Sequence, residues 1–190
     1  MPDEPARTAD GAGRSYGPGT LAVHAGLPDP IDGQPISPNP VLAAPYHLTG
    51  ETDGAAHGGY ARYGNPTYTH LEDAIGALEG GHALSFASGM AATTAAVLPL
   101  VAPGDVVVVT ADGYPGIRSI AAERLPPMQV EVRLVPTDTQ ELVAASAGAS
   151  LIWVETPSNP HLTACDIAAV AQAARDNDAR LVVDNTLATP

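Results

Sequence analysis

Residues 105–110, with the sequence DVVVVT, place four valines in an unbroken row. A strand with one face in water alternates apolar and polar residues, whereas a strand covered by helices on both faces is apolar throughout. This stretch therefore predicts a central strand of a parallel sheet. Residues 151–155, LIWVE, have the same character and predict a second buried strand.

Strand and helix patterns alternate on both sides of these two stretches. The expected strands are short apolar runs at residues 83–87, 105–110, 130–135, 151–155 and 180–183. The expected helices have apolar residues at helical spacing, or capping signals, at residues 68–79, 90–97, 116–125, 140–147 and 166–177. This alternation indicates βαβ units, so we expect an α/β fold: a three-layer αβα arrangement with a mostly parallel sheet.

Residues 1–59 differ from the rest of the chain. They are rich in Gly, Pro, Ala and Asp and show little periodicity. We expect an extended N-terminal arm that is loosely ordered up to about Gly19, followed by one large domain over residues 60–190.

Composition excludes several classes of function. The 190 residues carry a formal net charge of -13, which disfavours nucleic acid and anionic membrane surfaces as partners. We find no signal peptide and no apolar stretch near the ~20 residues that span a bilayer. The lone Cys165 fits a reducing compartment. We therefore expect a soluble cytoplasmic protein that binds neither nucleic acid nor membrane.

Every one of the eight basic residues is an arginine, so the chain contains no lysine. A phosphate-binding loop of nucleoside triphosphatases needs a Gly-Lys step and is excluded. The six histidines do not pair with Cys165 or a carboxylate at metal-ligand spacing, so no metal site is expected. There is no Gly-x-Ser-x-Gly elbow of an α/β-hydrolase.

Ligands of parallel sheets bind beyond the carboxyl ends of the strands. Ser88, Gly89 and Met90 follow the expected strand at residues 83–87 and begin a helix, where free N–H groups and the helix dipole favour phosphate. The alternative is an ordinary N-cap with a tight turn. Asp184 ends the last expected strand and is either a helix cap or a functional anion.

Five strings of residues change the interpretation when they are taken together. They are LAVHAG at 21–26, YARYGNPT at 60–67, SGMAA at 88–92, ETPSNP at 155–160 and VDNT at 183–186. In this order and spacing they resemble the cystathionine synthase and lyase family of pyridoxal-phosphate enzymes. The resemblance covers about residues 21–190 and implies the large domain of a fold-type-I pyridoxal-phosphate-dependent transferase, in truncated form.

The resemblance implies two phosphate-binding groups. The backbone amides of Gly89 and Met90, beside Ser88, would hold the phosphate of the cofactor. Tyr60 and Arg62 resemble the pair that reaches into the phosphate site of a neighbouring subunit, where Arg is a bidentate donor. A homo-oligomer, a dimer or tetramer, is therefore expected for the intact enzyme.

The resemblance also implies three groups around the ring of pyridoxal phosphate. Tyr114 resembles the aromatic residue that stacks on the pyridine ring, and it is the one catalytic residue that we assign. Asp184 resembles the carboxylate that pairs with the pyridinium nitrogen and makes the ring an electron sink. Asn159 resembles the residue near the ring oxygen and the substrate carboxylate.

The sequence departs from the family in two places. Pro115 and Gly116 follow the stacking tyrosine where the family has small residues, which puts the substrate side of the pocket in doubt. The lysine that forms the Schiff base lies a short way beyond the Asp-Asn-Thr motif in the family, and this chain ends at Pro190. That lysine, the Ser and Thr before it and the smaller C-terminal domain are not in this sequence, so we expect the chain alone to be inactive.

The family cleaves or exchanges substituents at the β or γ carbon of sulfur amino acids. We expect cystathionine gamma-lyase as the parent activity, with an amino-acid substrate such as cystathionine. Cystathionine gamma-synthase and the homoserine-ester sulfhydrylases, which use homoserine esters, share the motifs. Two other hypotheses remain: a non-catalytic remnant that pairs with full-length subunits, and an interrupted gene or fragment without a function of its own.

Overall fold

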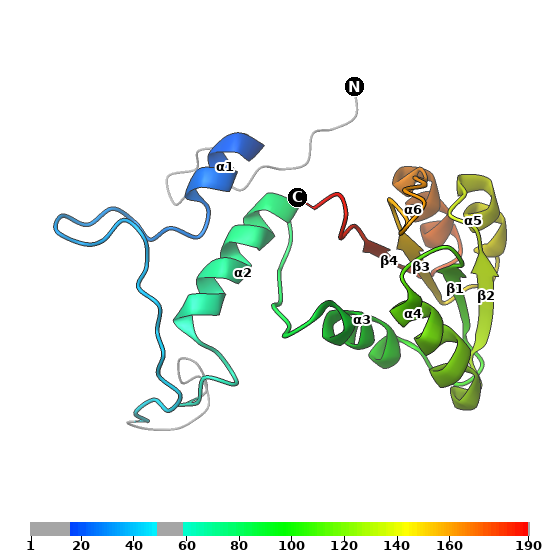
Figure 1. The fold of residues 1–190 in the computed structure, drawn as a ribbon, viewed down its shortest axis with the longest axis horizontal. Coiled ribbons are helices and arrows are strands. Elements are labelled where there is room, and N and C mark those ends of the chain that lie inside the picture. The colour runs from blue at the N-terminus through cyan, green and yellow to red at the C-terminus, as the bar shows by residue number, and fades with distance from the viewer. Residues whose placement is uncertain (1–15, 49–58, 190) are drawn as a thin grey trace. The chain divides into compact units, whose positions relative to one another are not determined.

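The computed structural model describes residues 16–48 and 59–189. They form two compact units, one running up to Ser85 and one over Phe86–Thr189 (Figure 1). The first unit contains α1 (Pro18–His24) and α2 (Pro66–Glu79). The second contains a parallel sheet and the helices that cover it.

The sheet of the second unit has four strands in the order β2-β1-β3-β4, and every neighbouring pair is parallel. The strands are β1 (Val106–Thr110), β2 (Glu131–Val135), β3 (Leu151–Glu155) and β4 (Arg180–Asp184). Two helical segments precede β1: α3 (Gly89–Val97) and η2 (Leu98–Leu100). Those between the strands are α4 (Pro115–Ser119), η3 (Ile120–Arg124), η4 (Pro126–Met128), α5 (Thr139–Ala145) and α6 (Ile167–Asp176). The four C-terminal strands predicted from the sequence are confirmed to within a residue at each end.

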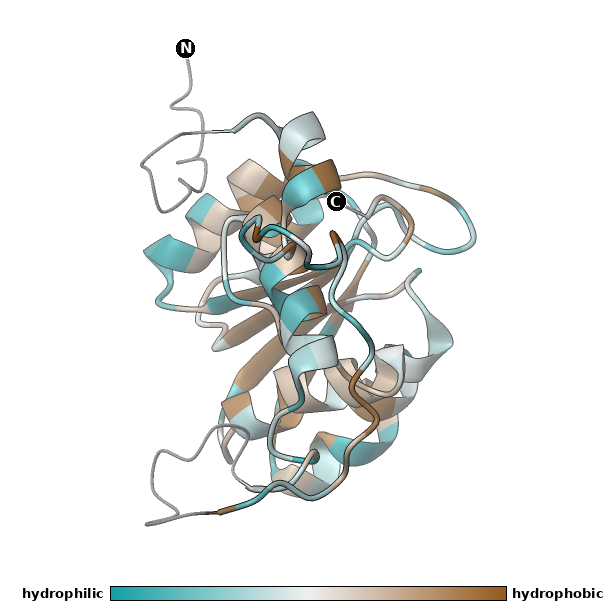
Figure 2. Ribbon diagram, turned by 90° about the vertical axis from the view of Figure 1, so that its left-hand side faces the viewer, coloured by the Kyte–Doolittle hydropathy of each residue, from teal (hydrophilic) through white to brown (hydrophobic). Residues whose placement is uncertain are grey.

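The valine row of β1 is buried on both faces of the sheet, and much of the sheet is brown in Figure 2. Val107 and Val109 pack on one side, in the core that contains residues of α3, α4 and η3. Val108 packs on the other side with Leu142 of α5 and Val170 of α6. Helices therefore cover both faces, and the predicted three-layer αβα fold is confirmed.

Side-chain caps begin three of the helices in this unit. The Ser88 hydroxyl accepts a hydrogen bond from the Ala91 N–H at 3.1 Å, as predicted for α3. Asp138 caps α5 and Asp166 caps α6 in the same way, each through two N–H groups of the first turn. Such caps satisfy N–H groups that have no acceptor inside the helix.

Three predictions about regular structure were wrong in detail. Residues 83–87 form no strand, because no neighbouring strand among the described residues pairs with them, and Leu84 is 78 % exposed. The single helix predicted at 116–125 is α4 followed by the π-helical turn η3. Helical spacing predicts Ile167 on the core-facing side of the helix at residues 166–177, but it is 43 % exposed, and Ala173 is buried in α6 instead.

In the first unit, α2 begins two residues before its predicted start. Asn65 caps it by accepting a hydrogen bond from the Thr67 N–H at 2.8 Å, and Pro66 stands at the first helical position. The short helix α1, which lies in the predicted arm, contacts α2. Gly26 has φ +75°, and a Cβ there would lie 2.8 Å from that of Ala74, so this contact requires glycine.

The expected disorder before Gly19 falls mostly on residues outside the described ranges, and the division into an arm and one domain stays a prediction. No helix within residues 16–48 and 59–189 is both long and apolar enough to span a membrane.

Candidate functional site

A pocket of about 510 Å³ lies at the carboxyl ends of the strands in the second unit. Its volume is in the range of small-molecule sites, and its position is the one that parallel sheets favour for ligands. Six of the eight residues predicted from the sequence line it: Ser88, Gly89, Met90, Tyr114, Asn159 and Asp184. The fold therefore brings together side chains that are almost 100 residues apart in the chain.

The N-terminus of α3 forms one wall of this pocket. Ser88 occupies the cap position, and Gly89 and Met90 form the first turn. A Cβ added to Gly89 would meet no atom within 4 Å, so the backbone there is open to a ligand. Because the first turn of a helix presents N–H groups and a positive dipole end, this wall suits an anion such as phosphate.

Tyr114 lies on the loop after β1, immediately before α4, and is 47 % exposed. Its backbone N–H donates a hydrogen bond to Glu155 Oε2. Gly116 packs beneath it: a Cβ there would lie 2.8 Å from Tyr114 Cε1 and would collide with Met90 Sδ. The glycine noted as a departure from the family thus lets Met90 and Tyr114 approach each other.

Asp184 is the last residue of β4. Its Oδ1 accepts hydrogen bonds from the Thr186 backbone N–H at 3.1 Å and from the Thr186 hydroxyl at 2.6 Å. No helix follows it in the described chain up to Thr189, so it closes a turn instead of capping a helix. The carboxylate both holds that turn and lines the pocket.

Asn159 lies on the exposed loop after β3, and a network behind it fixes the loop. The buried Ser158 accepts a hydrogen bond from the Thr163 N–H at 3.2 Å. Asp112, on the loop after β1, accepts hydrogen bonds from the Thr137 N–H at 2.8 Å and the Thr137 hydroxyl at 2.7 Å. Asp112 also interacts with the Ser158 hydroxyl, so one carboxylate ties together the loops after β1, β2 and β3.

The environment of Asp112 keeps it ionised. Burial acts to raise the pKa of this carboxyl, but the hydrogen bonds from Thr137 and Ser158 outweigh burial and hold its pKa below the ordinary value of 3.8. A charged Asp112 is therefore the form that stabilises the three loops at neutral pH.

Several residues of the pocket were missed in the sequence, among them Trp153 and Glu155. Trp153 is 3 % exposed, and its Nε1 has no hydrogen-bond partner among the described residues. The apolar run at 151–155 predicted only that this strand is buried, and gave no signal for a ligand.

The donor set fits pyridoxal phosphate. The N-terminus of α3 suits its phosphate, and the exposed face of Tyr114 suits its aromatic ring. Asp184 offers the carboxylate for the ring nitrogen.

Tyr60 and Arg62 belong to the first unit. Tyr60 forms an isolated antiparallel bridge with Pro45. The Arg62 guanidinium lies 5.1 Å from the centre of the Tyr60 ring and 5.3 Å from that of Tyr63, which are cation–π distances. The two predicted residues thus contact each other within this unit.

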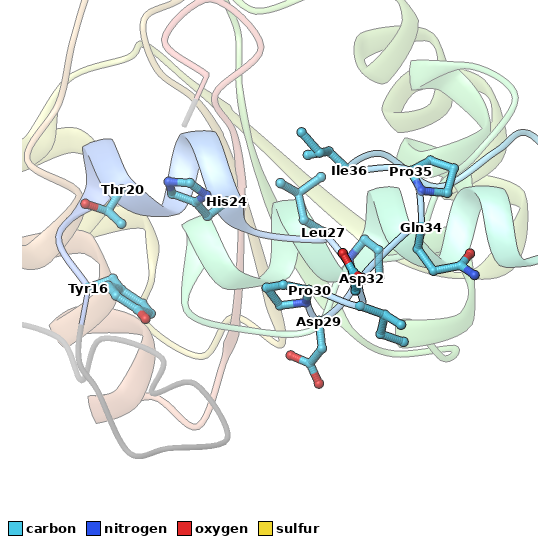
Figure 3. A pocket seen from close by; sticks show the side chains of 13 residues that line it. Tyr16, Thr20, His24, Leu27, Asp29, Pro30, Asp32, Gln34, Pro35 and Ile36 are labelled. Carbon is cyan, nitrogen blue, oxygen red and sulfur yellow. The ribbon is translucent and has the colours of Figure 1, made fainter.

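The first unit also contains an open hollow of about 950 Å³ between α1 and residues 27–36 (Figure 3). None of the predicted site residues lines it. Within residues 16–48 and 59–189, no group of three or more His, Cys, Asp or Glu is placed to hold a metal ion.

Comparison with known proteins extends the resemblance. The family model described as "Cys/Met metabolism PLP-dependent enzyme" matches residues 19–190. The "Putative cystathionine gamma-lyase" of Streptomyces coelicolor is 44% identical over 179 residues, covering 92% of this chain and 45% of that protein. A cystathionine gamma-synthase of Mycobacterium tuberculosis is 40% identical over 182 residues, covering 92% of this chain and 46% of that protein.

The solved structure of a cystathionine gamma synthase from Xanthomonas oryzae superposes with a TM-score of 0.81 at 30% identity, covering 93% of this chain and 46% of that one. The chain thus spans about half the length of the relatives that it matches. The match covers nearly all of the chain, and the family depends on pyridoxal phosphate. The chain belongs to the Cys/Met metabolism family of pyridoxal-phosphate-dependent enzymes.

Proposed function

We propose that this chain forms part of a pyridoxal-phosphate site, namely the wall that contacts the phosphate and the ring. The intact enzyme in this proposal is a cystathionine gamma-lyase. The observation that carries the proposal is the pocket at the carboxyl ends of the sheet, which gathers six of the residues expected to contact the cofactor.

Each of these residues has a distinct task in the proposal. The N–H groups of Gly89 and Met90 bind the phosphate, and Tyr114 packs its ring on the pyridine. Asp184 holds a proton on the pyridine nitrogen, and Asn159 orients the substrate carboxylate. When bound, pyridoxal phosphate supplies an electron sink for bond cleavage at the carbons of the amino acid.

The substrate in this proposal is a sulfur amino acid, cystathionine for a gamma-lyase. A homoserine ester is the substrate if the parent enzyme is a cystathionine gamma-synthase or a homoserine-ester sulfhydrylase. The relatives that match include proteins named for gamma-lyase and for gamma-synthase, so the comparisons support either activity as the parent one. A cytoplasmic location and a homo-oligomeric intact enzyme belong to the same proposal.

This chain has no lysine, so it does not itself carry the lysine that forms the Schiff base with the cofactor in the family. The family uses that lysine to hold the cofactor and to move protons, so we propose that the 190-residue chain has no turnover by itself. A second candidate is a non-catalytic partner of full-length subunits that offers Tyr60 and Arg62, which contact each other in the first unit, to their phosphate site. An in-frame, lysine-bearing continuation of the coding sequence beyond Pro190 would favour the first candidate.

Titration with pyridoxal phosphate tests the pocket. We expect weak, saturable binding to the wild-type chain, because stacking, hydrogen bonds and one ion pair each contribute only about 1–3 kcal/mol. Asp184→Asn keeps an oxygen for the Thr186 hydrogen bonds but removes the charge, and should weaken binding about tenfold. Asp176→Asn, on the exposed side of α6, is the control. Equal affinity of wild type and Asp184→Asn would contradict the proposal.

A further inference from the structure

Glu155 is the most deeply buried carboxyl group at the candidate pocket. It ends β3, a central strand of the described sheet, and is 4 % exposed. In the register of the sheet it is paired with Asp184 at the end of β4. Burying a carboxyl group beside another acid costs free energy, and hydrogen bonds to its oxygens are needed to offset that cost.

The contacts of this carboxyl group lead to two of the residues expected at the cofactor. Glu155 Oε2 accepts a hydrogen bond from the backbone N–H of Tyr114, which lies 41 residues earlier in the chain. The backbone N–H of Asn159 also interacts with the carboxyl group. One side chain therefore connects the loop that carries the stacking ring with the loop that carries Asn159.

The space around the carboxyl group is closely filled. A Cβ added to Gly113 would lie 2.9 Å from Glu155 Oε2 and 3.1 Å from Thr110 Oγ1. The same Thr110 hydroxyl accepts a hydrogen bond from the Glu155 backbone N–H at 3.2 Å. The residue before Tyr114 must be small for the loop to reach the carboxyl group, so the loop and Glu155 fit each other.

We propose that Glu155 is a positioning residue of this pocket: by accepting the Tyr114 and Asn159 amides, its carboxyl group fixes the Tyr114 ring and Asn159 for the cofactor. The inference rests on the proposed function. Glu155 acts through these two residues and has no contact with the cofactor assigned to it. The acceptor oxygens make this contribution because they receive the two amide N–H groups, and the charge does not.

Two substitutions separate the acceptor from the charge. Glu155→Gln keeps one acceptor oxygen at the same reach for the Tyr114 N–H and removes the charge, whereas Glu155→Asp keeps the charge and withdraws the oxygens by one methylene. Gly113→Ala disturbs the same contact from the other side, because its Cβ would press on Oε2. Glu131→Asp is the control, since that side chain is 60% exposed on β2.

Hydrogen exchange at the Tyr114 amide is the first readout, and it needs no cofactor. We expect slow exchange in wild type, Glu155→Gln and Glu131→Asp, and exchange about tenfold faster or more in Glu155→Asp and Gly113→Ala. Unchanged protection of β1 and β3 shows that the variants are folded. Equal exchange in wild type, Glu155→Asp and Gly113→Ala would overturn the inference.

Ligand affinity is the second readout. Glu155→Asp should weaken pyridoxal phosphate about tenfold and leave inorganic phosphate unchanged, because inorganic phosphate needs only the N-terminus of α3. Glu155→Gln should bind both ligands like wild type. If Glu155→Asp lost affinity equally for both ligands, or if Glu155→Gln lost as much affinity as Glu155→Asp, Glu155 would have a general structural role. Either result would overturn the inference. A wild-type chain that binds no pyridoxal phosphate would refute the proposed function, and the exchange data would still decide whether Glu155 positions Tyr114.

Discussion

Glu155 and Asp184 are paired residues in the register of β3 and β4, so two carboxyl groups stand side by side where the sheet ends. Burial is the main cause that raises the pKa of Glu155, and the charges of Asp184 and Asp112 raise it further. The N–H groups of Tyr114 and Asn159 oppose this shift but do not cancel it. Burial beside Asp184 therefore favours the neutral form of Glu155.

The raised pKa of Glu155 has a consequence for stability. A group whose pKa is higher in the folded state contributes stability below its unfolded pKa, and this contribution is lost as the pH rises through the folded value. We therefore expect Glu155→Gln to gain stability relative to wild type as the pH increases from about 4.5 upward. Urea unfolding of both proteins over a pH series measures this, and a difference that stays constant with pH would contradict it.

The Asp112 network predicts the opposite pH dependence. Asp112→Ala removes the acceptor for Thr137 and Ser158, which are 2% and 0% exposed, and should lower the free energy of unfolding by about 1–3 kcal/mol at neutral pH. Because the pKa of Asp112 is lowered, its contribution is present above the ordinary value of 3.8 and is lost as the pH falls through the folded pKa.

Chemical unfolding at neutral pH and at a pH well below 3.8 measures this cost. Asp73→Ala, at an exposed position of α2, provides the control. The account of the loops fails if Asp112→Ala and Asp73→Ala are equally stable at neutral pH.

Gly116 should matter to the ligand more than to the fold. Alanine is favoured over glycine in a helix by roughly 0.5–1 kcal/mol, which offsets part of the cost of moving Met90, so Gly116→Ala in α4 should still fold. Its Cβ would displace Met90 and the Tyr114 ring, so pyridoxal phosphate should bind about tenfold more weakly. Gly19→Ala is the control, because its Cβ would meet nothing within 4 Å. Equal affinities of Gly116→Ala and Gly19→Ala for pyridoxal phosphate would contradict a role of the contact between Gly116, Met90 and Tyr114 in binding.

No covalent attachment of the cofactor is expected on this chain. A stable reduced adduct requires a primary amine at the pocket, and the chain has no lysine. Incubation with pyridoxal phosphate, borohydride reduction and peptide mass spectrometry test this, with a lysine-containing family member treated in parallel. A stoichiometric adduct within residues 60–190 would contradict the prediction.

The core of the fold could be predicted from the sequence because burial leaves a local pattern. The apolar run of β3 marked its bounds at Leu151 and Glu155, and Ser88 marked the start of α3. The strand expected at residues 83–87 failed because a strand requires a hydrogen-bonded neighbour, which no local pattern supplies. The helix α1 was missed because it is short and buries no residue.

The candidate site also contains residues that could be predicted from the sequence and residues that could not. Residues after the strands, such as Asp184 and Tyr114, could be proposed because parallel strands end at one edge and because the motifs resemble a family. Glu155 could not be assigned a role, since its importance depends on the register with β4 and on a hydrogen bond to a loop 41 residues away. The strand register and this hydrogen bond arise from the packing of the sheet and not from spacing along the chain.

Fusion of this chain, after Pro190, to the downstream half of a family member tests the central claim most directly. The account predicts that the fusion binds pyridoxal phosphate and releases ammonia and 2-oxobutyrate from cystathionine, that Asp184→Ala in the fusion abolishes most of this activity, and that the 190-residue chain alone shows none. Turnover by the purified chain alone would contradict the account. So would a well-folded fusion that neither binds the cofactor nor turns over the substrate.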